Sequence, residues 1–166
     1  ENWQRTQAEV NYLMELFTEV MKRLEEGVEE ERVRVRFIGD RQDFSQELQD
    51  AMARLESSSE QYSETTIWVA LSYGGRRELI DGVNRAIAGG KLVTEKQFAE
   101  LLWTADMPDP DLIVRTSGEQ RLSNFLTWGS VYSELLFLDK HWPALTKDDF
   151  IAILEEYESR NRRRGT

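Results

Sequence analysis

The sequence contains no cysteine and a single histidine among its 166 residues. Without cysteine the chain forms neither disulfide bonds nor thiolate metal sites, and one histidine excludes histidine-rich metal sites and mechanisms that need a histidine pair. Any metal ion must therefore bind to oxygen ligands.

Long apolar runs are also missing. No stretch approaches the roughly 18 apolar residues of a membrane-spanning helix, and the opening ENWQRTQAEV lacks the apolar segment of a secretion signal. These absences predict a soluble chain. We also expect the protein in the cytoplasm.

Positive charge is scarce as well. Asp and Glu number 31 against 21 Lys and Arg, which gives a net charge of -10 and a pI near 4.7. Phosphate-backbone binding needs a basic stripe, so no nucleic-acid partner is expected. The one dense basic run, RNRRRGT at the end, is by composition alone a solvated tail that complements the carboxyl end of a helix.

Helix and strand patterns alternate along the chain, whose length fits a single domain. The segment 6–27 has the spacing of an amphipathic helix that begins at a Thr6 and Glu9 capping box and ends at Gly27. Apolar strands that alternate with helices predict an α/β fold with a mostly parallel sheet flanked by helices. Further helices are expected over 43–56, after the Tyr-Gly-Gly turn at 73–75, and over 94–103, 123–128 and 146–164. Strands are expected over 33–39, from 65 onward, and over 111–116 and 133–139.

Anion-binding side chains gather after the strand expected at 111–116, and ligands of parallel sheets bind beyond the carboxyl ends of the strands. There Arg115 and Arg121 stand on either side of a glycine turn and Ser123 follows, so two guanidinium groups and a hydroxyl are able to converge on a diphosphate. The competing interpretation pairs an arginine with Glu119 and makes Ser123 a simple helix cap. Both interpretations fit the residues about equally well.

Two further features bear on this hypothesis. Glu134 opens the next strand, where its carboxylate is either a hard oxygen ligand for Mg²⁺ or a plain strand-edge charge. The apolar face of the helix over 6–27 either packs into the core, which its periodicity favours, or lines a groove beside the anion site. Such a groove would suit an amphiphile with a diphosphate head and a hydrocarbon tail.

Five segments occur in the order and spacing of one known family: ENWQR, YGGRRE, PDPDLIVRTSGEQRLSNFLTW, YSELLF and RNRRRG. In them the chain resembles the cis-prenyltransferases, the family of undecaprenyl diphosphate synthase. The resemblance implies a Mg²⁺-dependent enzyme that condenses isopentenyl diphosphate with an allylic diphosphate such as farnesyl diphosphate, making a Z-polyprenyl diphosphate. It also implies a hydrophobic tunnel for the growing chain, a homodimer, and transient contact with the membrane that receives the lipid product.

By the same resemblance, Arg115, Arg121 and Ser123 would hold the head group of isopentenyl diphosphate, and Glu134 would help to place Mg²⁺. Asn2 would assist proton removal from isopentenyl diphosphate. Trp3 and Arg5 are implied to contact the allylic substrate. The tunnel would be lined by Leu13, Leu16 and Phe17. Arg163 and Gly165 would reach the diphosphate site of the neighbouring subunit.

The chain departs from the family pattern at two places. Ser72 stands where the family usually has asparagine before Tyr-Gly-Gly-Arg, and the family's first strand with its Asp-Gly-Asn motif has no counterpart here. We therefore expect residues 1–166 to be the C-terminal two-thirds of one catalytic domain, preceded in the native protein by roughly 50 to 80 residues. The alternatives are a non-catalytic subunit that binds diphosphate and a catalytic partner, and an unrelated phosphate-binding α/β domain.

Overall fold

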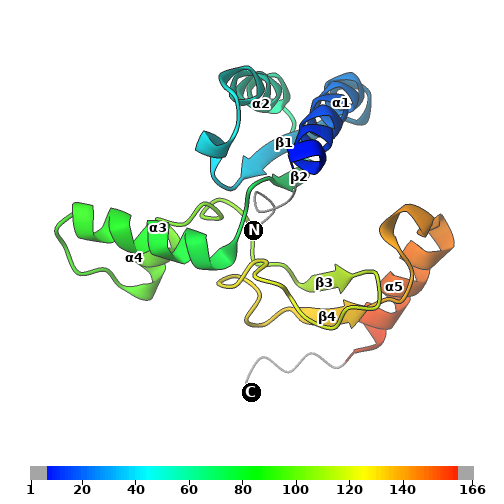
Figure 1. Cartoon of the computed structure of the whole chain (residues 1–166). Coiled ribbons are helices and arrows are strands. Elements are labelled where there is room, and N and C mark those ends of the chain that lie inside the picture. Colours follow the sequence, from blue (N-terminus) through cyan, green and yellow to red (C-terminus); the bar gives the residue numbers. More distant parts are fainter. Residues whose placement is uncertain (1–6, 161–166) are drawn as a thin grey trace. The chain divides into compact units, whose positions relative to one another are not determined.

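The computed structural model describes residues 7–160 and contains two compact units, Glu1–Tyr73 and Gly74–Thr166 (Figure 1). In the described part of the chain, each unit combines a pair of parallel strands with helices. This combination confirms the predicted α/β class with parallel sheets. The single domain over 1–166 and the hydrophobic tunnel stay predictions.

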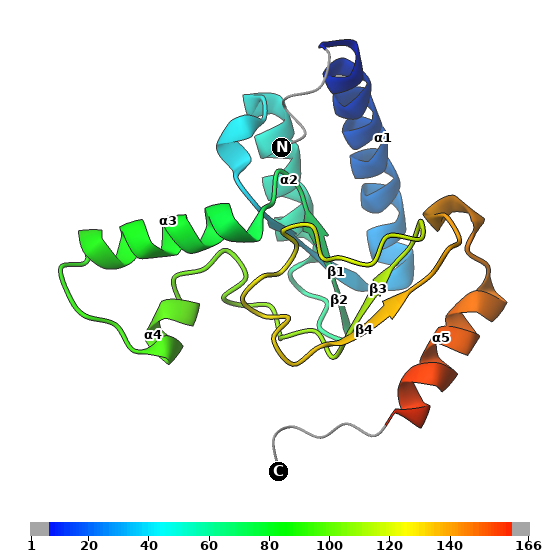
Figure 2. The ribbon, with the colours of Figure 1, turned by 60° about the horizontal axis from the view of Figure 1, so that its bottom comes forward.

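The first unit is a parallel strand pair with two helices packed on it. Its strands pair along their full lengths, and both helices contact the first strand as well as each other (Figure 2). The elements are α1 (Gln7–Glu31), β1 (Val33–Ile38), a 3₁₀ turn over Arg41–Asp43, α2 (Gln46–Ser59) and β2 (Thr65–Ala70).

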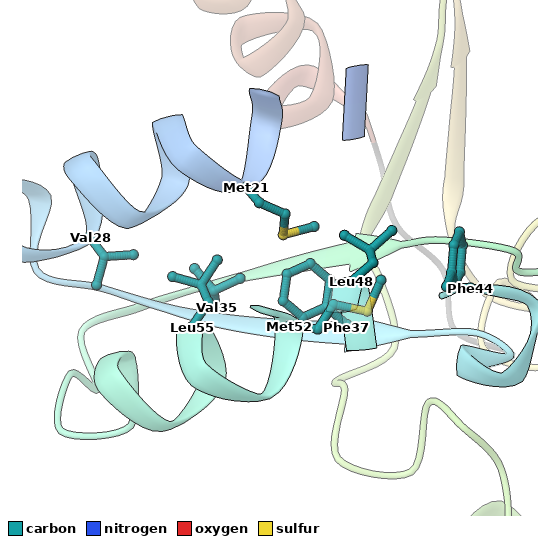
Figure 3. Packing of buried hydrophobic residues seen from close by; sticks show 8 residues of the cluster. All are labelled: Met21, Val28, Val35, Phe37, Phe44, Leu48, Met52 and Leu55. Carbon is teal, nitrogen blue, oxygen red and sulfur yellow. The ribbon is translucent and has the colours of Figure 1, made fainter. Parts of the chain in front are cut away.

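The core of this unit lies where α1, β1 and α2 meet (Figure 3). Val35 and Phe37 are buried together because every second side chain of a strand points to the same face. From α2, Met52 and Leu55 are each only 1% exposed, as expected for residues three apart on one helical face. The remaining buried members of the cluster are Met21, Val28, Phe44 and Leu48.

Side chains of α2 cover the edge of β1 that is not paired with β2. The fully buried Ser59 accepts a hydrogen bond from the backbone N–H of Val35 at 3.0 Å, and Glu56 accepts one from the N–H of Phe37 at 2.9 Å. Arg41 pairs with the same Glu56 carboxylate at 2.6 Å. Because buried backbone donors need partners, these two side chains serve β1 in place of a neighbouring strand.

The long helix α1 runs further than predicted. Gly27 does not end it, since glycine inside a helix costs only about 1 kcal/mol and the helix continues to its last residue at position 31. Arg32 then leaves the helical region with a φ of 52°. No helix in the described range 7–160 is both long and apolar enough to cross a bilayer.

The second unit holds a second parallel strand pair. Strands β3 and β4 pair along their full lengths, and the closing helix follows β4 (Figure 1). The elements are α3 (Gly75–Ala88), α4 (Glu95–Ala99), β3 (Leu112–Arg115), β4 (Glu134–Phe137), a 3₁₀ turn over Trp142–Ala144 and α5 (Lys147–Ser159). The buried apolar side chains are Leu102, Ile113, Leu126, Leu136 and Ile153.

A buried carboxylate fixes α3 against the loop after α4. Glu78 is 1% exposed, and both the backbone N–H and the hydroxyl of Thr104 donate to it, at 2.9 and 2.7 Å. One turn later, Asp81 accepts a hydrogen bond from the indole N–H of Trp103 at 2.9 Å. These hydrogen bonds fix α3 in place, and the first residues of this helix, which contact the candidate site, are fixed with it.

The first turn of α5 contains an acid-sensitive contact. Lys140 donates to the Asp149 carboxylate at 2.6 Å, as do the hydroxyl and backbone N–H of Thr146, and these bonds lower the pKa of Asp149 from 3.8 to about 2. A pKa that is lower in the folded state means that this stabilisation is complete above the unfolded value of 3.8 and is lost as the pH falls towards 2.

We expect Asp149→Asn to flatten the fall in unfolding temperature between about pH 4 and pH 2. Asp148→Asn is the matched control, because it removes an exposed carboxylate from the same turn and leaves the Lys140 contact in place. Thermal unfolding over this pH range measures both variants. Equal slopes for the two variants would contradict the assignment.

Candidate functional site

The segment after β3 brings two of the predicted site residues together. Nη1 of Arg115 donates to the hydroxyl oxygen of Ser123 at 2.8 Å and also to the backbone carbonyl oxygen of Arg121. Arg115 is the last residue of its strand, so the contact lies at the carboxyl end of the parallel pair, where ligands of such sheets bind.

The guanidinium of Arg121 is held by a neighbouring carboxylate. Its Nη1 donates to Oε2 of Glu119, and the two side chains are 62% and 46% exposed. The competing interpretation of the sequence predicted such a pair. Because an exposed ion pair contributes only about 0 to 1 kcal/mol, a diphosphate is able to take the place of Glu119.

Residues 123–128 form turns, and the helix predicted for them is wrong. Ser123, Asn124 and Leu126 have φ values of 47°, 65° and 45°, whereas a right-handed helix needs negative φ. Ser123 consequently caps no helix, and its hydroxyl faces Arg115. Positive φ in residues other than glycine is strained, and such strain is concentrated at functional sites.

Asn124 ties this turn to the start of α3. Its carbonyl oxygen accepts the N–H of Gly75 at 2.7 Å, and its Oδ1 accepts the N–H of Arg76 at 2.8 Å. A Cβ on Gly74 would lie 2.8 Å from Nδ2 of Asn124, and one on Gly75 would lie 2.1 Å from the hydroxyl oxygen of Thr127. The glycines therefore allow close packing of the turn, and two of the helix N–H groups that would suit an anion are occupied. Sequence reasoning missed this role of Asn124, although adjacent glycines before a helix indicate close approach by another segment.

Glu134, the first residue of β4, is paired with Arg160, the residue that follows α5. Nη1 of Arg160 donates to Oε2 of Glu134 and to the carbonyl oxygen of Leu135, both at 3.0 Å, while Nη2 donates to Glu156 at 2.7 Å. The contacts with Glu156 and then Glu134 raise the pKa of Arg160 above its ordinary value. Sequence reasoning gave Arg160 no role, because its partner lies 26 residues away.

A prenyltransferase family model described as putative undecaprenyl diphosphate synthase matches residues 1–165. The chain belongs to this family. An isoprenyl transferase of Thermotoga maritima is 44% identical over 170 residues, which cover 99% of this chain and 73% of that protein. A ditrans,polycis-undecaprenyl-diphosphate synthase of Legionella pneumophila, named as (2E,6E)-farnesyl-diphosphate specific, is 38% identical, with 99% and 72% covered. The crystal structure of a probable undecaprenyl diphosphate synthase from Campylobacter jejuni matches with a TM-score of 0.92 at 30% identity, with 99% and 78% covered.

Membership confirms the predicted family and the predicted enzyme class, a cis-prenyltransferase that acts on isoprenyl diphosphates. Of the predicted tunnel residues, Leu16 is 40% exposed, and Phe17 packs edge-on against Phe44 with ring centroids 6.0 Å apart. The side chain of Leu13 lies outside the described part of α1. Also outside the described residues are Asn2, Trp3, Arg5, Arg163 and Gly165.

Glu134, the residue of this prenyltransferase that was predicted to bind the metal ion, lies within the described part of the chain. Within residues 7–160, no group of three or more acidic or histidine side chains is placed to hold a metal ion. Mg²⁺ is often bound through one or two carboxylates together with substrate phosphates, so a single carboxylate fits this kind of site. The Oε1 atom of Glu134 accepts no hydrogen bond from the described residues.

Proposed function

We propose that this cis-prenyltransferase condenses isopentenyl diphosphate with an allylic diphosphate such as farnesyl diphosphate, in a Mg²⁺-dependent reaction. The product is a Z-polyprenyl diphosphate, and diphosphate is released. The observation that carries the proposal is the contact of Arg115 with Ser123 at the end of β3, in a chain that belongs to this family. Guanidinium and hydroxyl donors side by side suit the oxygens of a diphosphate.

Arg121 and Glu134 complete the described part of this proposal. Arg121 would break its ion pair with Glu119 and bind the diphosphate of isopentenyl diphosphate alongside Arg115. Two guanidinium groups bind a multiply charged anion better than one. Glu134 would hold Mg²⁺, which when bound offsets the negative charge of the diphosphates.

The remaining assignments stay predictions. They concern the cytoplasmic location, the homodimer, the transient contact with a membrane, and the roles of Asn2, Trp3, Arg5, Leu13, Leu16, Phe17, Arg163 and Gly165.

The test is an elongation assay on the intact protein. It is incubated with labelled isopentenyl diphosphate and either farnesyl or geranylgeranyl diphosphate, with Mg²⁺ or with a chelator, and the lipid products are separated by length. We expect a ladder of products with farnesyl diphosphate that disappears with the chelator. The ladder also gives the length of the product.

Two results would contradict the proposal in different ways. Binding of isopentenyl diphosphate without elongation from either primer would favour the non-catalytic subunit, and a second, different chain should then co-purify. Selective binding of a nucleotide in place of isopentenyl diphosphate would show that Arg115 and Ser123 do not form an isopentenyl diphosphate site.

A further inference from the structure

Arg160 contacts both a side chain and the backbone of β4. A single nitrogen, Nη1, donates both to Oε2 of Glu134 and to the carbonyl oxygen of Leu135, so the carboxylate is fixed relative to the backbone of its own strand. The other terminal nitrogen binds Glu156, in the last turn of α5. The backbone N–H of Arg160 donates to the carbonyl oxygen of Tyr157 at 3.2 Å, which anchors the arginine itself to the helix end.

Among the described residues, one oxygen of the Glu134 carboxylate accepts a hydrogen bond and the other accepts none. Arg160 occupies Oε2, whereas Oε1 accepts no hydrogen bond from the described residues. A glutamate that is one-third exposed otherwise moves among several rotamers, and ordering it on ligand binding costs conformational entropy. A partner that fixes the carboxylate in advance lowers this cost, as hydrogen-bonded partners of metal ligands do elsewhere.

We propose that Arg160 is a positioning residue that orients the Glu134 carboxylate for a divalent metal ion. The inference rests on the proposed metal role of Glu134 and extends it to the residue that caps the carboxyl end of α5.

The positive charge of Arg160 opposes a cation, and Glu156 offsets this effect. Arg160 lies between two carboxylates, at 3.0 Å from Glu134 and 2.7 Å from Glu156, so the three groups together carry one net negative charge. A cation that approaches Oε1 therefore meets an anionic group whose geometry is already set. Orientation, and not simple charge, is then the main contribution of Arg160.

The experiment measures Mn²⁺ binding to the intact protein by electron paramagnetic resonance, with isopentenyl diphosphate present. We expect Arg160→Met to weaken Mn²⁺ binding by about 10-fold, the lower end of the range for lost partners of metal ligands. Arg160→Lys should recover part of the loss, because an ammonium group is able to reach one of the acceptors that the guanidinium binds. Circular dichroism and the binding of isopentenyl diphosphate without metal should stay as in the unchanged protein.

Two companion variants separate the inference from the proposal beneath it. Glu156→Gln breaks the other ion pair of Arg160 and leaves the Glu134 contact, so Mn²⁺ binding should fall far less than in Arg160→Met. If Glu134→Gln binds Mn²⁺ normally, the proposed metal role of Glu134 is wrong. If Glu134→Gln loses Mn²⁺ while Arg160→Met binds it as well or better, the metal role stands and the positioning role is overturned.

Discussion

Replacing Arg115 by alanine is expected to lower kcat/KM for isopentenyl diphosphate by about 100-fold. A hydrogen bond to a charged group contributes about 1.5 to 3 kcal/mol, and about 1.4 kcal/mol corresponds to a factor of ten. The side chain also donates to Ser123 and to the carbonyl oxygen of Arg121, so its loss removes two contacts that hold the segment after β3. Because the diphosphate is bound before and during the reaction, most of the effect should appear in KM.

Two further variants decide what the loss means. Arg115→Lys keeps the charge but not the planar fork, so an intermediate loss is expected. Arg85→Ala is the matched control, since it removes an exposed arginine that pairs with Asp81 on α3. Steady-state kinetics and calorimetric titration of isopentenyl diphosphate measure all three variants. Equal values for Arg115→Ala and Arg85→Ala would show that the diphosphate binds elsewhere.

Much of the fold follows from local pattern. The strand over 33–38 was predictable because alternate buried residues such as Val35 and Phe37 mark one face. Helices were expected from 94 and from 146, and capping boxes at Thr94 and Thr146 begin α4 and α5 there. Each cap residue and its partner lie only three positions apart. Such features depend on neighbours in sequence, so a single chain reveals them.

The features that were missed depend on partners far along the chain. The turn at Asn124 has positive φ because its backbone and amide oxygens accept hydrogen bonds from the start of α3. One of these donors, Arg76, lies 48 residues earlier in the chain. The contact of Arg160 with Glu134 likewise joins the end of one element to the start of another. Arg115 and Ser123 could be placed near each other in advance because a glycine turn and only eight residues separate them. Sequence spacing therefore placed Arg115 close to Ser123 but did not find the residues that hold this segment in place.

Gly39→Ala is expected to destabilise the protein by about 4 kcal/mol. Gly39 follows β1 with a φ of 121°, and a Cβ there would lie 1.9 Å from the carbonyl oxygen of Leu71. The hydrogen bonds from Leu71 to Ile38 and from Asp40 to Ser72, at 3.0 and 3.3 Å, fix the backbone on both sides, so the chain has little room to move away. Unfavourable φ costs about 1 to 3 kcal/mol, and overpacking costs about 1 to 3 kcal/mol more.

The same substitution at Gly27 should have the opposite sign. Gly27 lies inside α1 in the same unit, and a Cβ there would meet no atom within 4 Å. Alanine should therefore stabilise the helix by about 0.5 to 1 kcal/mol, because it restricts the unfolded chain more than glycine does. Urea unfolding followed by circular dichroism gives both free energies of unfolding. If the two variants differ by less than about 1 kcal/mol, which is small beside the summed costs at Gly39, the backbone between β1 and the end of β2 is not fixed in the way described.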